Sequence, residues 1–120
     1  MEDSILDSVK KQLGNGPELD AFDSQLIMNI NSVFVILNQL GVGPADGFRI
    51  TDNSARWSDY LSAYNQLDIV KDYVYLRVKM IFDPPASSAA MDSLKRIADE
   101  YEWRINIAVD PVNTTPKKGA

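Results

Sequence analysis

Apolar residues recur along most of the chain at steps of three and four, the spacing of amphipathic helices. Residues 67–82 carry two neighbouring apolar stripes, Leu67, Val70, Val74, Val78 and Ile81 in one and Ile69, Tyr73, Leu76 and Met80 in the other. A helix that is apolar around most of its circumference has to be covered on several sides. The pattern therefore predicts a central helix with the other helices packed around it.

Local signals mark both ends of this central helix. Asn65 is placed to cap its start, and Tyr64 and Ile69 occupy the two positions of a hydrophobic staple. Pro84 disfavours helical geometry at the residue before it, so we expect the helix to end near Asp83.

Two further helices are predicted before it. Ser4 and Asp7 form a capping pair for a short helix over residues 5–13, whose narrow apolar stripe predicts a place on the bundle surface. The next helix begins with Asp23 as its cap and runs for almost five turns. It ends at Gly41, with Val42 placed to fold back in a Schellman motif.

A long helix is predicted after residues 84–85, with Ser87 or Ser88 as its cap. Glu100 and Arg104 are spaced as a favourable pair on its wet side. A narrow apolar seam faces the bundle: Met91, Leu94, Ala98, Tyr101, Ile105 and Ala108. We expect Pro111 to close the helix.

The connection between the second and the central helix contains a different pattern. Residues 48–51 alternate apolar and polar side chains, which predicts one short strand. A lone strand leaves its backbone groups unpaired, so either a nearby segment or another subunit is expected to pair with it. Asp52 or Ser54 is expected to start a short helical turn that carries Trp57.

These elements together predict an all-α fold, a small bundle of about four helices with one short strand-like loop. We expect one helical domain over residues 1–110. Residues 111–120 are polar and lack periodicity, which predicts a disordered C-terminal tail.

Composition narrows the classes of function. The 120 residues include 12 basic and 17 acidic side chains, a net charge of −5, which disfavours a general nucleic-acid binder and docking on an anionic membrane. The longest apolar run, residues 33–37, is too short to span a bilayer, and the acidic N-terminus lacks a signal-peptide pattern, so a cytoplasmic origin is expected. The chain has no cysteine and no histidine, so the usual general base, the soft metal ligands and thiolate chemistry are missing.

Few side chains remain as candidates for chemistry or binding. Asp46, Asp52 and Asp59 could serve a carboxylate-only enzyme, but turn and cap roles are favoured. Trp57 and Trp103 are equally compatible with interface anchors and with partial burial. For Lys71, Arg77 and Lys79, solvated or ion-paired roles at the bundle edge are favoured over binding of DNA phosphate. Lys117 and Lys118 are equally compatible with docking of an acidic partner and with a tail that only adds solubility.

Several stretches in this order resemble the head–tail connector proteins of long-tailed bacteriophages. They are INSVFVILNQLGVGP, the F-x-I at Phe48 and Ile50, WSDYL at residues 57–61, VKDYVYLRVKMIFDPPASSA and the late EYEWRIN. The resemblance covers roughly Ser4 to Val109. It depends on the order and spacing of the stretches together, because none of them is diagnostic alone.

The resemblance implies an all-α structural protein of the virion, at the head–tail junction, without catalytic residues, cofactors or metal. Members assemble into a ring, commonly dodecameric, below the portal protein, continue the DNA channel and receive the next neck or tail-completion protein. By this analogy Phe48, Arg49, Ile50 and Trp57 are predicted at the contact between copies. Pro111, Lys117 and Lys118 are predicted to dock a partner.

Two other readings stay open at this point. A monomeric or dimeric helical adaptor would bind one protein partner through residues 48–57. The other hypothesis is a small carboxylate-dependent enzyme or metal-binding hydrolase, which the missing histidine disfavours.

Overall fold

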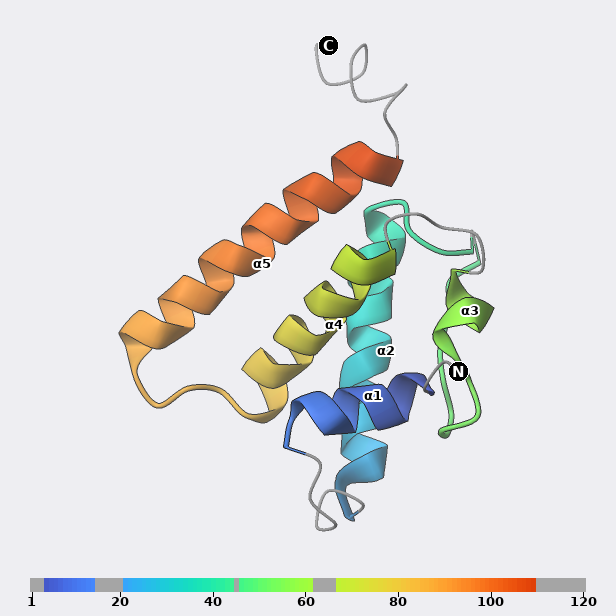
Figure 1. Ribbon diagram of the computed structural model, residues 1–120, viewed down its shortest axis with the longest axis horizontal. Helices are drawn as coiled ribbons and strands as arrows, with labels where there is room; N and C mark the ends of the chain where they lie inside the picture. Colours follow the sequence, from blue (N-terminus) through green and yellow to red (C-terminus); the bar gives the residue numbers. More distant parts are fainter. Residues whose placement is uncertain (1–3, 15–20, 45, 62–66, 110–120) are drawn as a thin grey trace.

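A computed structural model of the chain describes residues 4–14, 21–44, 46–61 and 67–109. These residues form five helices and no sheet (Figure 1). The predicted all-α bundle is confirmed, and the shortest of the five helices is the helical turn that was expected to carry Trp57. The helices are α1 (Ile5–Gln12), α2 (Asp23–Gln39), α3 (Trp57–Tyr60), α4 (Leu67–Phe82) and α5 (Ser88–Val109).

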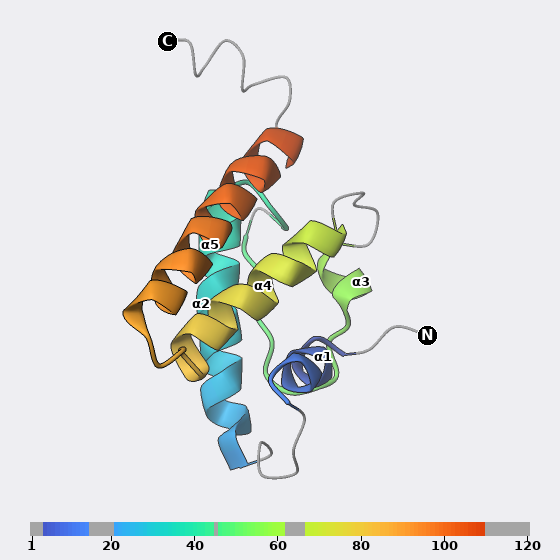
Figure 2. The same ribbon diagram turned by 60° about the vertical axis from the view of Figure 1, so that its left-hand side comes forward.

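Helix α4 is the centre of the bundle, as its two apolar stripes predicted. It packs against α1, α2 and α5, which cover it from three sides (Figure 2). Val70, Tyr73, Val74 and Val78 are fully buried. Ile81, which was assigned to the same buried stripe, is 52% exposed, because it lies in the last turn of α4 where the chain leaves the bundle.

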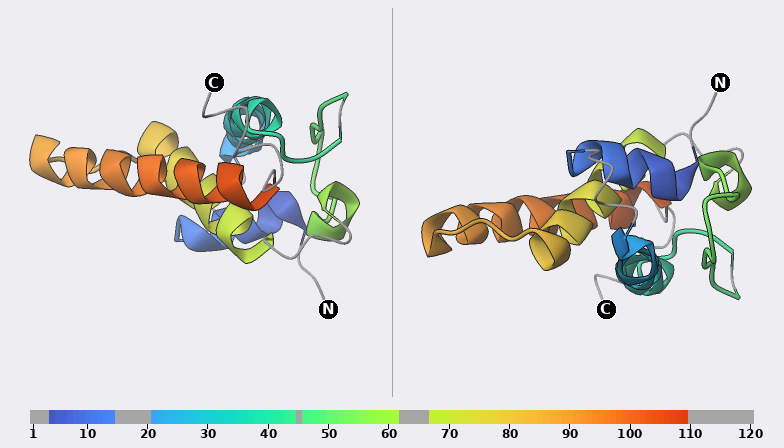
Figure 3. Two further views of the ribbon diagram at one scale, coloured as in Figure 1. Left: turned by 90° about the horizontal axis from the view of Figure 1, so that it is seen from above. Right: turned by 90° about the horizontal axis from the view of Figure 1, so that it is seen from below.

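Helix α1 lies across α2 and α4, with Asp7 and Lys11 exposed on its outer side (Figure 3). The predicted cap is confirmed, because the Asp7 N–H donates to Ser4 Oγ at 2.9 Å. The inner side of α1 belongs to the core, where Ile5 and Val9 are fully buried. Although the apolar stripe of α1 is narrow, the helix therefore packs against both α2 and α4.

The start of α2 differs from the prediction. Phe22 occupies the N-cap position without a side-chain cap bond, so the assignment of Asp23 as the cap is wrong. The Asp23 carboxylate instead accepts from Lys10 Nζ of α1 at 2.9 Å. The Phe22 ring lies edge-on against Phe82 of α4, with ring centroids 5.6 Å apart. These contacts join the lower end of α2 to both neighbouring helices.

Helix α5 follows its predicted pattern. The Ala90 N–H donates to Ser87 Oγ at 3.0 Å, so Ser87 is the cap. Ala98 and Ile105 of the seam are buried against the bundle. The exposed pair predicted on the wet side is present, with Arg104 Nη2 2.6 Å from Glu100 Oε2.

One polar contact joins α4 to α5 inside the bundle. The Tyr73 hydroxyl donates to Glu102 Oε2 at 2.6 Å, while the Tyr73 ring is fully buried. Burial, and next the hydrogen bond to Glu102, raise the pKa of Tyr73 well above its usual range. The folded protein therefore holds this hydroxyl in its protonated form.

Some sequence predictions fall outside the described residues. These are the cap at Asn65, the staple residue Tyr64, the helix stop at Pro111 and the disordered tail over residues 111–120.

Within the described part of the chain, every helix is too short or too polar to cross a membrane.

The position of α4 gives a first prediction. Val74→Asp should lower the free energy of unfolding by more than about 3 kcal/mol, because it puts an unpaired charge into the closed interface of α4 with its neighbours. Ile81→Asp places the same charge on an exposed position of the same helix and should cost less than about 1 kcal/mol. Urea unfolding followed by circular dichroism measures both. Equal losses would contradict the central position of α4.

The Tyr73–Glu102 contact gives a second prediction. At neutral pH, Tyr73→Phe should lower the free energy of unfolding by about 2 kcal/mol, through loss of a hydrogen bond to a charged group. The raised pKa stabilises the fold fully below the usual tyrosine pKa of about 10, and this stabilisation is lost as the pH rises above it, because only the unfolded chain then ionises. The difference in the free energy of unfolding between the parent and Tyr73→Phe should therefore shrink between about pH 9 and about pH 11, as measured by urea titrations. A difference that grows over this range would contradict the assignment.

Candidate subunit interface

The predicted interface lies on the segment that links α2 to α3, and a tight turn starts it. Gly41 has a φ of 93°, and the Val42 N–H donates to Leu37 O at 2.9 Å, which confirms the Schellman motif. Gly43 follows with a φ of 90° and lies against Tyr60 so closely that an added Cβ would be 2.6 Å from the ring. Both glycines are needed to turn the chain back along α2.

An asparagine of α2 then takes the place of a neighbouring strand. The Ile50 N–H donates to Asn31 Oδ1 at 2.8 Å, and Asn31 Nδ2 donates to Ile50 O at 3.0 Å. Residues 48–51 form a loop and not the predicted strand. The partner expected from a nearby segment or from another subunit is, at Ile50, the Asn31 side chain. A side-chain amide carries one donor and one acceptor in the same plane, so it can replace a strand at one residue.

Further along, the segment is joined to α1. The Ile5 N–H donates to Ala55 O at 2.9 Å, and Ser4 and Arg56 form an isolated bridge. Arg56 is the N-cap of α3, and its N–H donates to Asp59 Oδ2 at 2.8 Å. The short helix therefore starts at Arg56 and not at Asp52 or Ser54, because the Asp59 carboxylate that accepts from the cap lies three residues after Arg56.

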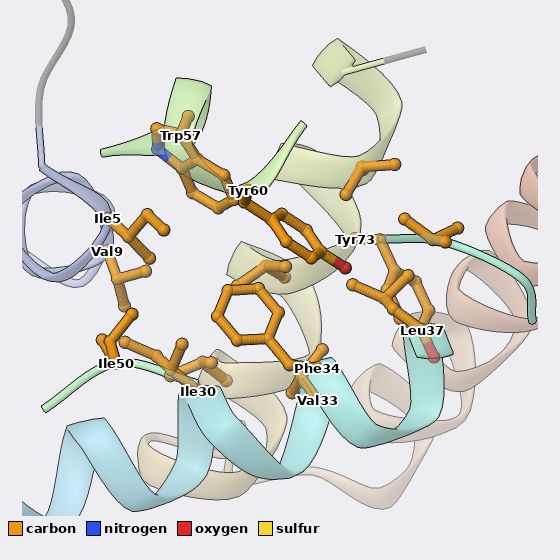
Figure 4. Close-up of a cluster of buried hydrophobic side chains, with 14 of the residues drawn as sticks. Ile5, Val9, Ile30, Val33, Phe34, Leu37, Ile50, Trp57, Tyr60 and Tyr73 are labelled. Atoms are coloured by element: carbon orange, nitrogen blue, oxygen red, sulfur yellow. The ribbon is translucent and has the colours of Figure 1, made fainter. Parts of the chain in front are cut away.

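Trp57 is a core residue of the subunit. Its side chain is fully buried, and its indole N–H donates to Ser8 Oγ of α1 at 2.9 Å. Lys71 Nζ of α4 lies 5.8 Å from the ring centroid, within reach of a cation–π interaction. Figure 4 shows Trp57 pointing into the same cluster as Ile50 and the side chains of α1, α2 and α4.

Phe48 packs against this cluster from the outside. Its ring centroid lies 5.4 Å from that of Phe34 and 4.9 Å from that of Tyr60, and these two rings are 4.5 Å apart. Phe48 is half-buried, whereas its neighbour Arg49 is exposed. Of the four residues predicted at the contact between copies, Ile50 and Trp57 are thus inside the subunit, and Phe48 and Arg49 reach its surface.

A groove opens beside these two residues, between α2 and the segment. Its volume is about 350 Å³. Val35 of α2 lies on its wall and is 57% exposed. The other lining residues are Asn31, Phe34, Asn38, Asp46, Gly47, Phe48 and Arg49. Val35 was not among the predicted interface residues, although its place off the buried stripe of α2 was the available signal.

The acidic residues considered for catalysis have local structural roles or stand apart. The Ser54 hydroxyl and then the Ser54 N–H donate to the Asp52 carboxylate, at 2.6 and 2.9 Å, and lower the pKa of Asp52. Asp59 accepts from the start of α3, and Asp46 lies on the groove. No three acidic side chains among the described residues are grouped so that they could hold a metal ion.

The basic residues of α4 are also engaged within the subunit. Arg77 lies over the Tyr73 ring, 5.9 Å from its centroid, and Lys79 is paired with Asp83 at 3.4 Å. With Lys71 over Trp57, this agrees with the preferred prediction of residues at the bundle edge. The predicted docking residues Pro111, Lys117 and Lys118 lie outside the described residues.

Comparison with known proteins gives one match. A family model described as phage connector protein matches residues 5–112 of the chain. No curated protein and no solved structure matches it.

The role of Asn31 gives a third prediction. Asn31→Ala should lower the free energy of unfolding by about 2 kcal/mol, because it leaves the N–H and the C=O of Ile50 without partners. The Ile50 amide should also exchange its hydrogen faster. Ser32→Ala is the control, since its exposed hydroxyl only donates to Met28 O and its loss should change stability by less than about 0.5 kcal/mol. Unchanged exchange at Ile50 in Asn31→Ala would refute the role of this amide.

Proposed function

The chain belongs to the phage connector protein family, and from this premise we propose that copies of it form a ring below the portal protein. The ring would continue the DNA channel of the filled head and offer a platform to the next neck or tail-completion protein. The observation that carries the proposal is the family match, which includes all five helices. A structural role of the phage connector type follows from the family itself.

The surface of the subunit supports assembly. Large apolar side chains are exposed on several elements and not inside a catalytic cleft: Phe22, Met28, Val35, Ile81, Ile97, Trp103 and Ile107. They lie on α2, α4 and α5, so a subunit with neighbours on more than one side could bury them.

The charge of the chain suits a DNA conduit. Its net charge is −5, so a channel wall built from these subunits would repel the phosphate backbone more than it attracts it. Duplex DNA would then pass through without lasting contacts. This part of the proposal concerns passage only and assigns no DNA-binding residue.

We place the segment with Phe48, Arg49, Ile50 and Trp57 at the contact between copies. Arg49 and the outer side of Phe48 would touch the neighbour, because they reach the surface beside the groove. Ile50 and Trp57 would act from inside, by holding the segment against α2 and α1. For Pro111, Lys117 and Lys118 the proposed role remains docking of the portal or of a neck protein.

A genetic experiment tests the proposed function. A phage that cannot make this protein should produce DNA-filled heads that lose DNA or fail to join tails. Purified protein added to such heads should restore joining, and electron microscopy should show a ring of added density below the portal. Heads that join tails normally without the protein would overturn the proposal. A single bound copy without a ring would instead favour the monomeric or dimeric adaptor.

A further inference from the structure

The outer face of α5 carries one large aromatic side chain. Trp103 is 65% exposed and points away from the bundle, since Ala98 and Ile105 on the opposite side of the helix are buried. Two charged residues, Asp99 and Glu100, lie one turn before it, and the exposed apolar Ile107 lies one turn after it. An exposed tryptophan among charges has the composition of an interface anchor with a polar rim.

The groove beside α2 has a composition that is complementary to the surface around Trp103. Val35 and Phe48 form apolar walls, and Arg49 and Asp46 contribute one charge of each sign. Figure 1 shows the first turns of α5 far from the segment between α2 and α3, while its last turns lie near the end of α2, where Asn106 Nδ2 donates to Leu40 O at 3.3 Å. Trp103 and the groove belong to different elements of the subunit, so two copies can join them head to tail.

Charge complementarity indicates which residues of α5 and of the groove would be in contact. Arg104 is already paired with Glu100, whereas no described residue forms an ion pair with Asp99 or with Arg49. Asp99 lies one turn before Trp103 on the same face of α5, and Arg49 lies at the groove. An aspartate that enters with the tryptophan would thus meet an unpaired guanidinium. The Asp46 carboxylate of the groove can accept from the indole N–H.

We propose that Trp103 of one copy inserts into the groove between Val35 and Phe48 of the next copy, with Asp99 paired to Arg49. This inference rests on the proposed ring and names the two surfaces that build it. Each copy offers one tryptophan and one groove, so the contact is heterologous and leaves no free site only when the ring closes. The occupant of the groove is a second copy of this chain, because the matching anchor and charge are both on this chain.

The first test is a charge exchange. Heads from a phage that lacks the protein are incubated with increasing concentrations of purified variants, and the concentration that half-fills the portal vertices is measured by electron microscopy. Arg49→Asp and Asp99→Arg should each raise this concentration about tenfold or more, since each places like charges together. The variant with both changes should return to within about threefold of the parent chain. Asp72→Arg, a charge change equal to that of Asp99→Arg at an exposed position of α4, should have little effect.

The second test follows Trp103 itself. Trp103→Ser should raise the half-filling concentration about tenfold or more, whereas Met28→Ser, which removes an equally exposed apolar side chain outside the groove, should change it less than threefold. Trp57 is fully buried in the subunit, so acrylamide quenching of the parent chain reports on Trp103. Its fluorescence should be open to acrylamide quenching in the free subunit and protected in the ring.

The outcomes separate this contact from the proposed function. Three results would each contradict the proposed contact without contradicting the ring. They are normal ring formation with Trp103→Ser, a double charge variant that does not recover, and a Trp103 that stays open to quenching in the ring. A parent chain that never forms rings on heads would overturn the proposed function and the contact together. Circular dichroism of each variant verifies that its helices are intact.

Discussion

The whole fold depends on covering α4. Its valines and Tyr73 occupy more than one side of the helix, so a single partner helix would leave apolar surface in water. Helices α1, α2 and α5 supply three partners, and none of them buries its own apolar face without α4. The basic side chains that interrupt α4 are accommodated at the edges, over aromatic rings or beside Asp83. The bundle is thus cooperative around one helix, which is how a chain of 120 residues obtains one closed core.

The same core fixes the segment proposed to meet a neighbour. Asn31 holds Ile50, Ser8 holds Trp57, and the start of α1 holds Ala55. These bonds join the segment to two helices, so its exposed residues are presented on a rigid support. A preorganised surface loses less conformational entropy on binding than a flexible loop. This suits a connector subunit, which has to present the same surface in every copy of a ring.

The residues of this segment fall into two classes, those that face the core and those that face solvent. Residues that face inward, such as Trp57, control whether the surface exists, and residues that face outward, such as Arg49, control what it binds. A change at Trp57 would damage the fold before it reported on assembly. The groove and Trp103 therefore offer the better access to assembly, because both are exposed.

The sequence by itself determined the elements of this protein and their order around α4. Periodicity located the helices, Ser4, Ser87 and Gly41 marked their ends, and the double stripe identified the central helix, because these signals are local in the chain. Only the tertiary structure decided how residues 46–57 are used. The alternation at residues 48–51 is the same for a strand and for an extended segment bound by one asparagine, and no local signal announces a partner 19 residues away. Likewise, a tryptophan is compatible with core and surface, and only packing placed Trp57 in the interior and left Trp103 in solvent.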